Sequence, residues 1–118
     1  MRTGIDIVRI QRIREAIEKQ GGRFLGRIFT DKERAYCDAK ADPSLSYAAR
    51  FAAKEAFIKA VNGTKNLFSY NDVEILNEVS GAPVISLPEA MKEQFDVQTA
   101  SVSLAHEQEY AVAMVVVT

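Results

Sequence analysis

The sequence predicts an α+β fold, because helical and extended patterns occupy different parts of the chain. Residues 10–61 repeat apolar side chains at helical spacing, whereas residues 72–117 are rich in β-branched residues arranged as strands. The chain has 118 residues, of which 47% are hydrophobic, and this is the size and composition of one domain with one core. We therefore expect residues 1–118 to form a single domain, with an N-terminal strand and helices followed by a mainly antiparallel sheet.

The first expected element is a short strand over residues 4–8. Ile5 and Ile7 alternate with Asp6, so the two isoleucines lie on one side of this strand and the carboxylate on the other. An acidic residue is uncommon in a strand that is expected to be buried. This position marks Asp6 as a candidate functional residue.

Three helices are expected next. Isoleucines at helical spacing from residue 10, with arginines between them, predict a basic amphipathic helix that ends at a pair of glycines. Thr30 and Glu33 have the spacing of a capping box, which predicts a helix over residues 31–40. Residues 45–61 are alanine-rich and contain neither Gly nor Pro, so they predict a long helix that stops before an Asn-Gly pair.

The second part of the chain predicts four strands and one short helix. Both faces of the last strand are apolar, so we expect it to be central in the sheet and covered on both sides. The strands are expected over residues 72–79, 82–87, 99–104 and 110–117, and the helix over residues 88–95.

The formal net charge of -1 conceals an asymmetry between two parts of the chain. Residues 1–70 hold 14 Lys and Arg against 8 Asp and Glu, a balance of +6. Residues 71–118 hold one lysine against 8 acids, a balance of -7. The basic part indicates an anionic partner, either nucleic acid, a phosphorylated ligand or an acidic protein, although a solvated basic face would have the same composition.

The composition also bears on the compartment. The longest uninterrupted apolar run, residues 110–117, has eight residues, whereas roughly 20 are needed to span a bilayer. Charged residues near the N-terminus interrupt any apolar stretch that could serve as a secretory signal. Cys37 is the one cysteine, so no disulfide forms within the chain. We therefore expect a cytoplasmic protein without a membrane-spanning segment.

Several common functional motifs are absent from the sequence. One His and one Cys cannot form a zinc cluster, and the residues after His106 lack the HExxH spacing. Gly63-Thr64-Lys65 is not a P-loop, no GxGxxG motif occurs, and no serine lies in a nucleophile elbow. The informative segment is RFAAKEAFIKA, residues 50–60, within the expected long helix.

This segment carries two charged pairs. Glu55 and Lys59 lie one turn apart, beside two alanines that are too small to cover them, which predicts an open, charged notch. Arg50 and Lys54 have the same spacing and form a basic pair. The structural alternative is an ordinary ion pair on a solvated helix face.

The chain resembles a known family in three motifs that occur in order: GIDIVRIQRI, RFAAKEAFIKA and SVSLAHEQEYAVAMVV. This family is that of the holo-(acyl-carrier-protein) synthases, the small 4'-phosphopantetheinyl transferases, and the resemblance extends over nearly the whole chain. It implies the family's α+β fold and transfer of the 4'-phosphopantetheine arm from coenzyme A to a serine of an acyl carrier protein. Adenosine 3',5'-bisphosphate would leave, and the product would serve fatty acid biosynthesis.

The resemblance places Asp6 and Glu55 at the family's Mg²⁺ positions. Mg²⁺ is commonly held by one or two carboxylates together with phosphate oxygens and water, which suits a pyrophosphate substrate. Lys59 corresponds to a lysine near the phosphates, where its ammonium would act as a point charge. These three residues are the expected catalytic group. The base that takes the serine proton stays open between Glu55, Asp31, Glu33 and a water on the ion.

The resemblance also implies a coenzyme A site made from several parts of the chain. Arg50 would contact the phosphates, and His106 follows the penultimate strand, where the family has a histidine of this site. Gly63 lies in the loop after the long helix, which has the sequence NGTK in place of the family's GTG-like turn. Arg2 stands where the family's first glycine is usual. The remaining expected contacts are Ser103, Lys59 and Lys54, for which a surface position is the alternative.

The basic first helix has an expected partner within the family, which is an acidic helix of the carrier protein. The resemblance further implies a homotrimer with active sites between subunits. One subunit would supply the two acids, and its neighbour would complete the coenzyme A site. Contacts with the carrier are expected from Arg12, Arg14, Arg23 and Phe24.

Two other functions are compatible with the residues alone. One is a nucleic-acid-binding module that uses the basic helix, and the other is a metal-dependent hydrolase that acts on another pyrophosphate through Asp6 and Glu55. The first needs aromatic stacking positions or a known reader fold, but aromatic residues make up only 8% of the chain. We therefore expect neither nucleic acid nor a membrane as a partner.

Overall fold

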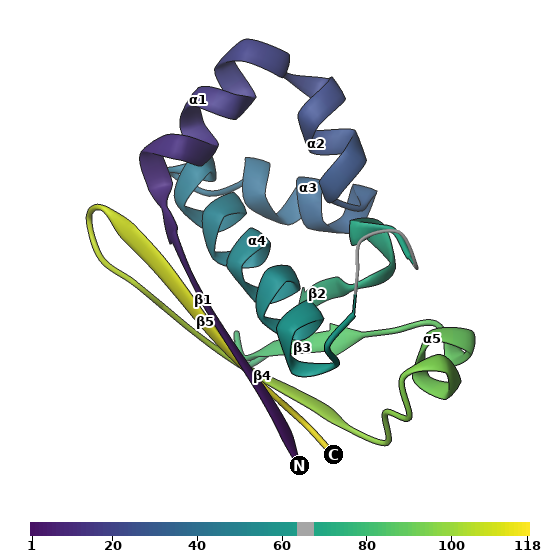
Figure 1. Cartoon of the computed structure of the whole chain (residues 1–118). Coiled ribbons are helices and arrows are strands. Elements are labelled where there is room, and N and C mark those ends of the chain that lie inside the picture. The colour runs from purple at the N-terminus through teal and green to yellow at the C-terminus, as the bar shows by residue number, and fades with distance from the viewer. Residues whose placement is uncertain (64–67) are drawn as a thin grey trace.

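The computed structural model describes residues 1–63 and 68–118 and has an α+β architecture (Figure 1). This fold class was predicted from the sequence and is confirmed. In chain order the elements are β1 (Arg2–Arg9), α1 (Ile10–Gln20), α2 (Gly22–Ile28), α3 (Asp31–Asp38), α4 (Pro43–Ala60), the short 3-10 helix η1 (Tyr70–Asp72), β2 (Glu74–Asn77), β3 (Pro83–Ser86), α5 (Glu89–Gln94), β4 (Ala100–His106) and β5 (Tyr110–Val117).

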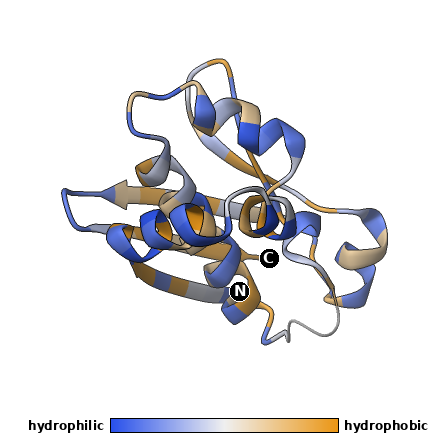
Figure 2. Cartoon of the chain, turned by 90° about the horizontal axis from the view of Figure 1, so that it is seen from above, coloured by the Kyte–Doolittle hydropathy of each residue, from blue (hydrophilic) through white to orange (hydrophobic). Residues whose placement is uncertain are grey.

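Helix α4 lies across a three-stranded sheet with the strand order β1-β5-β4, and β2 and β3 form a separate two-stranded sheet (Figure 1). All pairings between the described strands are antiparallel. Strand β5 is central, as its apolar sequence predicts, and the first strand of the chain pairs with it along its whole length. Figure 2 shows hydrophobic residues concentrated along the strands and hydrophilic residues on the helices around them.

Helix α4 approaches β1 very closely at Gly4. A Cβ atom on Gly4 would lie 1.9 Å from the carbonyl oxygen of Ala56 and 2.7 Å from the backbone nitrogen of Ala60. The helix presents small residues here, and Ala52 and Ala56 are completely buried. Glycine on the strand and alanine on the helix therefore bring the two backbones into contact.

The opposite face of this sheet is uncovered within the described part of the chain. Ile5 and Ile7 are 61% and 62% exposed, and Met114 on β5 is 46% exposed. The isoleucines lie opposite the Asp6 carboxylate, as predicted, but they are not buried. The prediction that β5 is covered on both sides is wrong for a single chain, because an apolar pattern does not say which chain covers it.

Helices α1, α3 and α4 lie close to their predicted limits. The predicted capping box is present: the Thr30 hydroxyl accepts from the Glu33 N–H at 3.3 Å, and the Glu33 carboxylate accepts from the Thr30 N–H at 2.9 Å. Pro43 is the first residue of α4, so this helix begins earlier than predicted.

Two short helices are missed by the sequence patterns. Helix α2 contains two glycines and has no side-chain cap, so its local propensity is low, and it is stabilised by burial of Leu25 and Ile28. Helix η1 occupies the start of the segment predicted as a strand, and β2 therefore begins at Glu74.

Strand β1 begins at Arg2, whose guanidinium donates to the Phe95 carbonyl oxygen at 2.7 Å.

Two expectations from composition concern the membrane and Cys37. No helix of the described residues has the length and apolar character needed to cross a membrane. Cys37 is a free, fully buried cysteine, and burial raises the pKa of its thiol to about 11. The thiol is therefore protonated at neutral pH and unreactive.

Replacing Gly4 with alanine should lower the free energy of unfolding by about 3 kcal/mol, because the new methyl group meets helix backbone. Urea denaturation followed by circular dichroism measures this loss. Gly26→Ala is the matched control, since the nearest atom to its Cβ is a terminal nitrogen of Arg34 at 3.8 Å. It should change stability by less than about 1 kcal/mol. Equal stability of Gly4→Ala and the wild type would contradict the close contact.

Candidate active site

Asp6 and Lys59 meet where β1 passes α4. The Lys59 ammonium donates to Asp6 Oδ1 at 3.0 Å and to the carbonyl oxygen of Ile5 at 3.0 Å. The side chain of Asp6 is 16% exposed and that of Lys59 is 55% exposed, so the pair lies at the rim of the helix-strand contact. It borders a hollow of about 530 Å³ that is also lined by Ile7 and Val112.

Glu55 lies one turn before Lys59 on α4 and is held by an aromatic residue. The Tyr70 hydroxyl donates to Glu55 Oε1 at 2.6 Å. The Tyr70 ring packs against Phe51, one helical turn before Glu55, with 5.8 Å between the ring centroids. The notch predicted beside small alanines is therefore covered in part, and Ala48 itself is completely buried.

The carboxylates of Asp6 and Glu55 fit a hard divalent cation. Both are oxygen donors, and they stand on the two elements whose approach is fixed at Gly4. Mg²⁺ takes one or two carboxylates from a protein and fills its other positions with phosphate oxygens and water. Among residues 1–63 and 68–118, no group of three or more His, Cys, Asp or Glu side chains could hold a metal ion. A cation completed by a phosphate substrate agrees with this donor set better than an all-protein cage.

Arg50 lines a second hollow, of about 340 Å³, on another side of α4. Only 3% of this residue is exposed. Its guanidinium donates to Asn77 Oδ1 and stacks over the Tyr36 ring at 4.1 Å from the centroid. The buried Arg50 Nε has no acceptor among the described residues. An anionic ligand would satisfy such a donor.

Ser103 and His106 line the same hollow from β4, so three of the predicted coenzyme A residues come together. Both residues are exposed. This hollow shares no lining residue with the one bordered by Asp6 and Lys59. In one chain, the two predicted halves of the site therefore lie in separate places.

Gly63 follows α4 and lies outside both hollows. A Cβ atom on Gly63 would lie 3.2 Å from the Phe68 ring and 3.4 Å from the Phe95 ring, so the loop packs closely here. Thr64 and Lys65 of the predicted NGTK loop are outside the described residues.

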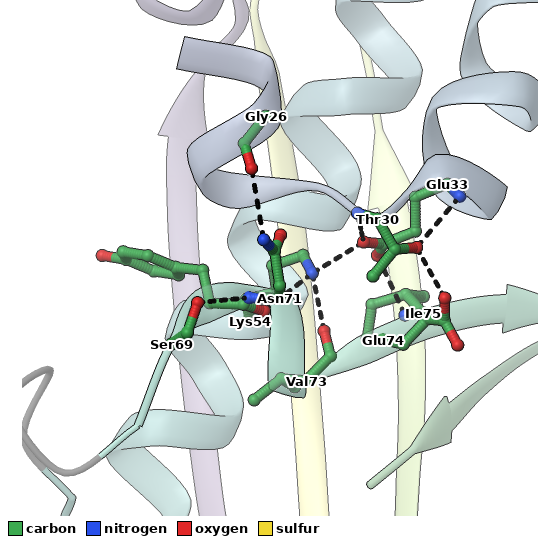
Figure 3. A network of polar contacts seen from close by, with 10 residues as sticks. Gly26, Thr30, Glu33, Lys54, Ser69, Asn71, Val73, Glu74 and Ile75 are labelled. Carbon is green, nitrogen blue, oxygen red and sulfur yellow. Dashed lines mark hydrogen bonds and ion pairs between the residues drawn. The ribbon is translucent and has the colours of Figure 1, made fainter. Parts of the chain in front are cut away.

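Lys54 is completely buried, so the alternative that it lies at the surface is wrong. Its ammonium forms an ion pair with Glu33 at 2.8 Å and donates to the carbonyl oxygens of Tyr70 at 3.0 Å and Val73 at 2.6 Å (Figure 3). Burial lowers the pKa of Lys54, and the neighbouring Glu33 opposes that shift. All three N–H groups of the ammonium donate within the protein, so Lys54 has no free donor for a ligand in this arrangement.

Both carboxylate oxygens of Glu33 also accept hydrogen bonds within the protein. Its Oε1 accepts from Lys54 and from the Thr30 N–H, and its Oε2 accepts from the Ile75 N–H at 2.9 Å (Figure 3). The residue is 1% exposed. Glu33 therefore cannot receive the proton of a substrate serine, whereas Asp31 is exposed at the start of α3.

The predicted docking residues lie on two helices, since Arg12 and Arg14 belong to α1, and Arg23 and Phe24 to α2. Arg14 forms an ion pair with Asp42 at 3.2 Å, which partly neutralises its charge. Arg12 and Arg23 are exposed, and neither forms an ion pair with another described residue. Phe24 is half-buried against a neighbouring aromatic ring at 6.3 Å between centroids.

Three residues of the site are missed by sequence reasoning. Tyr70 binds Glu55, and Tyr36 and Asn77 hold Arg50. They lie on η1, α3 and β2, so only the packing of these elements around α4 brings them to the site. No local pattern distinguishes them from other polar and aromatic residues.

Comparisons with known proteins show the family to which the chain belongs. Residues 2–115 match the family model of the 4'-phosphopantetheinyl transferase superfamily. The chain is 42% identical over 114 residues to the holo-(acyl-carrier-protein) synthase of Chlamydia trachomatis serovar D, which covers 96% of this chain and 95% of that protein.

Solved structures give the same result. The crystal structure of Helicobacter pylori holo-(acyl-carrier-protein) synthase in complex with coenzyme A matches with a TM-score of 0.91 and 36% identity, over 98% of this chain and 99% of that one. The Neisseria meningitidis synthase matches with a TM-score of 0.90 and 33% identity, over 99% and 97%. Both the sequence and the fold thus support the resemblance first seen in three motifs, and the chain belongs to the 4'-phosphopantetheinyl transferase superfamily.

Proposed function

We propose that this protein is a holo-(acyl-carrier-protein) synthase, which transfers 4'-phosphopantetheine from coenzyme A to a serine of an apo acyl carrier protein. The observation that carries the proposal is the meeting of Asp6 and Lys59 at the contact of β1 and α4, with Glu55 one helical turn before Lys59 on α4. Synthases of this name match the chain over nearly its whole length. We assign the activity to residues 1–118 as one domain.

The reaction forms a bond between the serine Oγ and the phosphorus that carries the pantetheine arm. The bond between this phosphorus and the oxygen of adenosine 3',5'-bisphosphate breaks, and its electron pair leaves with the bisphosphate. The serine proton passes to a base. Negative charge develops on the phosphate oxygens and the leaving group, so catalysis depends on positioning and on nearby positive charge.

Lys59 is suited to stabilise this charge. Its side chain is 55% exposed, and its ammonium already lies 3.0 Å from Asp6. A phosphate oxygen can replace the Ile5 carbonyl oxygen as the acceptor, because this contact is exposed and the carbonyl would not be left unpaired in the core. Lys59 would therefore hold the pyrophosphate beside the carboxylates.

Asp6 and Glu55 would hold Mg²⁺. When bound, this ion would neutralise charge on the pyrophosphate and orient it for in-line attack. Asp6 is held by Lys59 and Glu55 by Tyr70, so both carboxylates have fixed partners without the ion. The chain thus supplies one carboxylate from β1 and one from α4 as oxygen donors for a cation.

The hollow lined by Arg50, Ser103 and His106 is our proposed site for the phosphates of coenzyme A. A phosphate oxygen there would accept from the buried Arg50 Nε, which has no acceptor among the described residues. The stacking of Arg50 on Tyr36 and its bond to Asn77 hold the guanidinium in one orientation. This preorganisation would favour binding of an anion.

We also propose a homotrimer with active sites between subunits. The exposed apolar residues Ile5, Ile7 and Met114 form a sheet face that another subunit could bury. Ile7 lines the hollow beside Asp6, so a neighbour packed on this face would lie against the proposed cation site. This arrangement supports a site completed by the coenzyme A hollow of the neighbouring subunit.

Intact-protein mass spectrometry tests the proposed function. With Mg²⁺ and coenzyme A, the protein should increase the mass of an apo acyl carrier protein by one phosphopantetheine group. Asp6→Ala and Glu55→Ala should each slow transfer by at least about 100-fold, because each removes a carboxylate of the cation site. Glu89→Ala, which removes an exposed carboxylate from α5, should keep the wild-type rate.

No mass increase beside an active control enzyme would refute the proposal. Release of the bisphosphate from coenzyme A without a carrier would instead indicate a pyrophosphate hydrolase. Removal of divalent cations by chelation should stop transfer, and added Mg²⁺ should restore it.

Arg12→Glu should raise the KM for the carrier protein about tenfold and leave the KM for coenzyme A unchanged, because Arg12 is exposed on the basic helix α1. Lys92→Glu is the matched control, since it changes the net charge equally but lies on α5. Steady-state kinetics at two salt concentrations measure both constants. An equal rise in the KM for the carrier protein in both variants would mean that net charge alone controls docking.

Ile7→Asp should convert the trimer to a monomer and abolish transfer, because a carboxylate would then occupy the apolar sheet face. Light scattering should give the wild type three times the mass of one chain. Val79→Asp, at the fully exposed turn between β2 and β3, should stay trimeric and active. An active wild-type monomer would contradict the proposed assembly.

A further inference from the structure

Glu55 is held by a residue whose backbone is itself anchored in the core. The Tyr70 hydroxyl donates to Glu55 Oε1 at 2.6 Å, while the Tyr70 carbonyl oxygen accepts from Lys54 at 3.0 Å. Lys54 and Glu55 are adjacent on α4 but face different directions. One helix therefore fixes both ends of Tyr70, its hydroxyl through Glu55 and its backbone through Lys54.

The segment that carries Tyr70 is fastened at several further points. Asn71 Nδ2 donates to the Gly26 carbonyl oxygen on α2 at 3.2 Å, and Lys54 donates to the Val73 carbonyl oxygen at 2.6 Å (Figure 3). The Ser69 and Asp72 side chains form a capping box around η1. These contacts leave the tyrosine backbone little freedom to move relative to α4.

The anchor beneath this segment is the ion pair of Lys54 and Glu33. Both side chains are completely buried, and their nitrogen and oxygen atoms are 2.8 Å apart. Each charged atom has hydrogen-bond partners, which include the Ile75 N–H on β2. A buried pair with every group satisfied holds one geometry, because any displacement would leave a charge unpaired in the core.

We propose that Tyr70 is a positioning residue for Glu55, and that the buried Lys54 and Glu33 pair holds Tyr70 in place. This inference rests on the proposed function, in which Glu55 is a ligand of the divalent cation. A glutamate loses rotamer freedom when it binds an ion, and the bond from Tyr70 removes much of that freedom beforehand. The Tyr70 hydroxyl therefore raises cation affinity without contacting the reacting groups.

Tyr70→Phe tests the proposal, because it deletes the hydroxyl and keeps the ring that packs on Phe51. Titration with Mn²⁺, followed by the electron paramagnetic resonance signal of the free ion, should give a dissociation constant raised about tenfold. The half-saturating Mg²⁺ concentration for transfer should rise by a similar factor. The rate at saturating Mg²⁺ should change less than about twofold.

Tyr47→Phe is the matched control. It removes the bond from a buried tyrosine hydroxyl to Asp38 at 2.7 Å, on the side of α4 that faces α3. It should lower thermal stability and leave Mn²⁺ affinity unchanged. An equal loss of Mn²⁺ affinity in both variants would mean that general destabilisation causes the loss, and it would overturn the proposal.

Two further outcomes distinguish a failure of the positioning role of Tyr70 from a failure of the proposed cation site. If Glu55→Ala loses Mn²⁺ binding but Tyr70→Phe binds as tightly as the wild type, the positioning role is wrong and the cation site stands. If Glu55→Ala also binds Mn²⁺ as tightly as the wild type, the cation site itself is wrong. A lower saturated rate in Tyr70→Phe with unchanged Mn²⁺ affinity would place Tyr70 in the chemistry and overturn the proposal as well.

Discussion

The structure depends on the close approach of α4 to β1 at Gly4. No side chain fits between them, since a Cβ atom on this residue would lie 1.9 Å from a helix carbonyl oxygen. This contact aligns the strand with the helix, so that Asp6, two residues further along, meets Lys59. The proposed cation site is thus a consequence of backbone packing, and its precision comes from rigid elements rather than from loops.

A second constraint is the buried pair of Glu33 and Lys54. Removing two charges from water is unfavourable, and the cost is offset here because both groups are fully hydrogen-bonded. The pair connects α3, α4 and the segment from η1 to β2. It therefore joins the helical part of the molecule to the two-stranded sheet, next to the residues that surround Glu55.

In a single chain, the two proposed parts of the site lie in separate hollows. The hollow beside Asp6 and the hollow lined by Arg50 are separate, and the apolar sheet face adjoins the first of them. Arg12 on α1 and Arg23 on α2 are exposed and line neither of these hollows. The proposed subunit contact adjoins the proposed cation site, because Ile7 lines the same hollow as Asp6, whereas the proposed carrier-binding residues belong to other elements.

Local patterns alone predict helices that begin near residues 10, 31 and 45, the capping box and the apolar last strand. They also place Glu55 and Lys59 one turn apart on the same helix. These features depend on neighbours within one helical turn or along one strand. Only the tertiary structure decided that Lys54 is buried while Glu55 faces Tyr70, and that Ile5 and Ile7 stay exposed. These outcomes depend on residues distant in sequence, such as Glu33 and Tyr70, which come together only when the elements pack. The physical reason is that burial and ion pairing are properties of the packed chain, whereas periodicity is already present in the unfolded one.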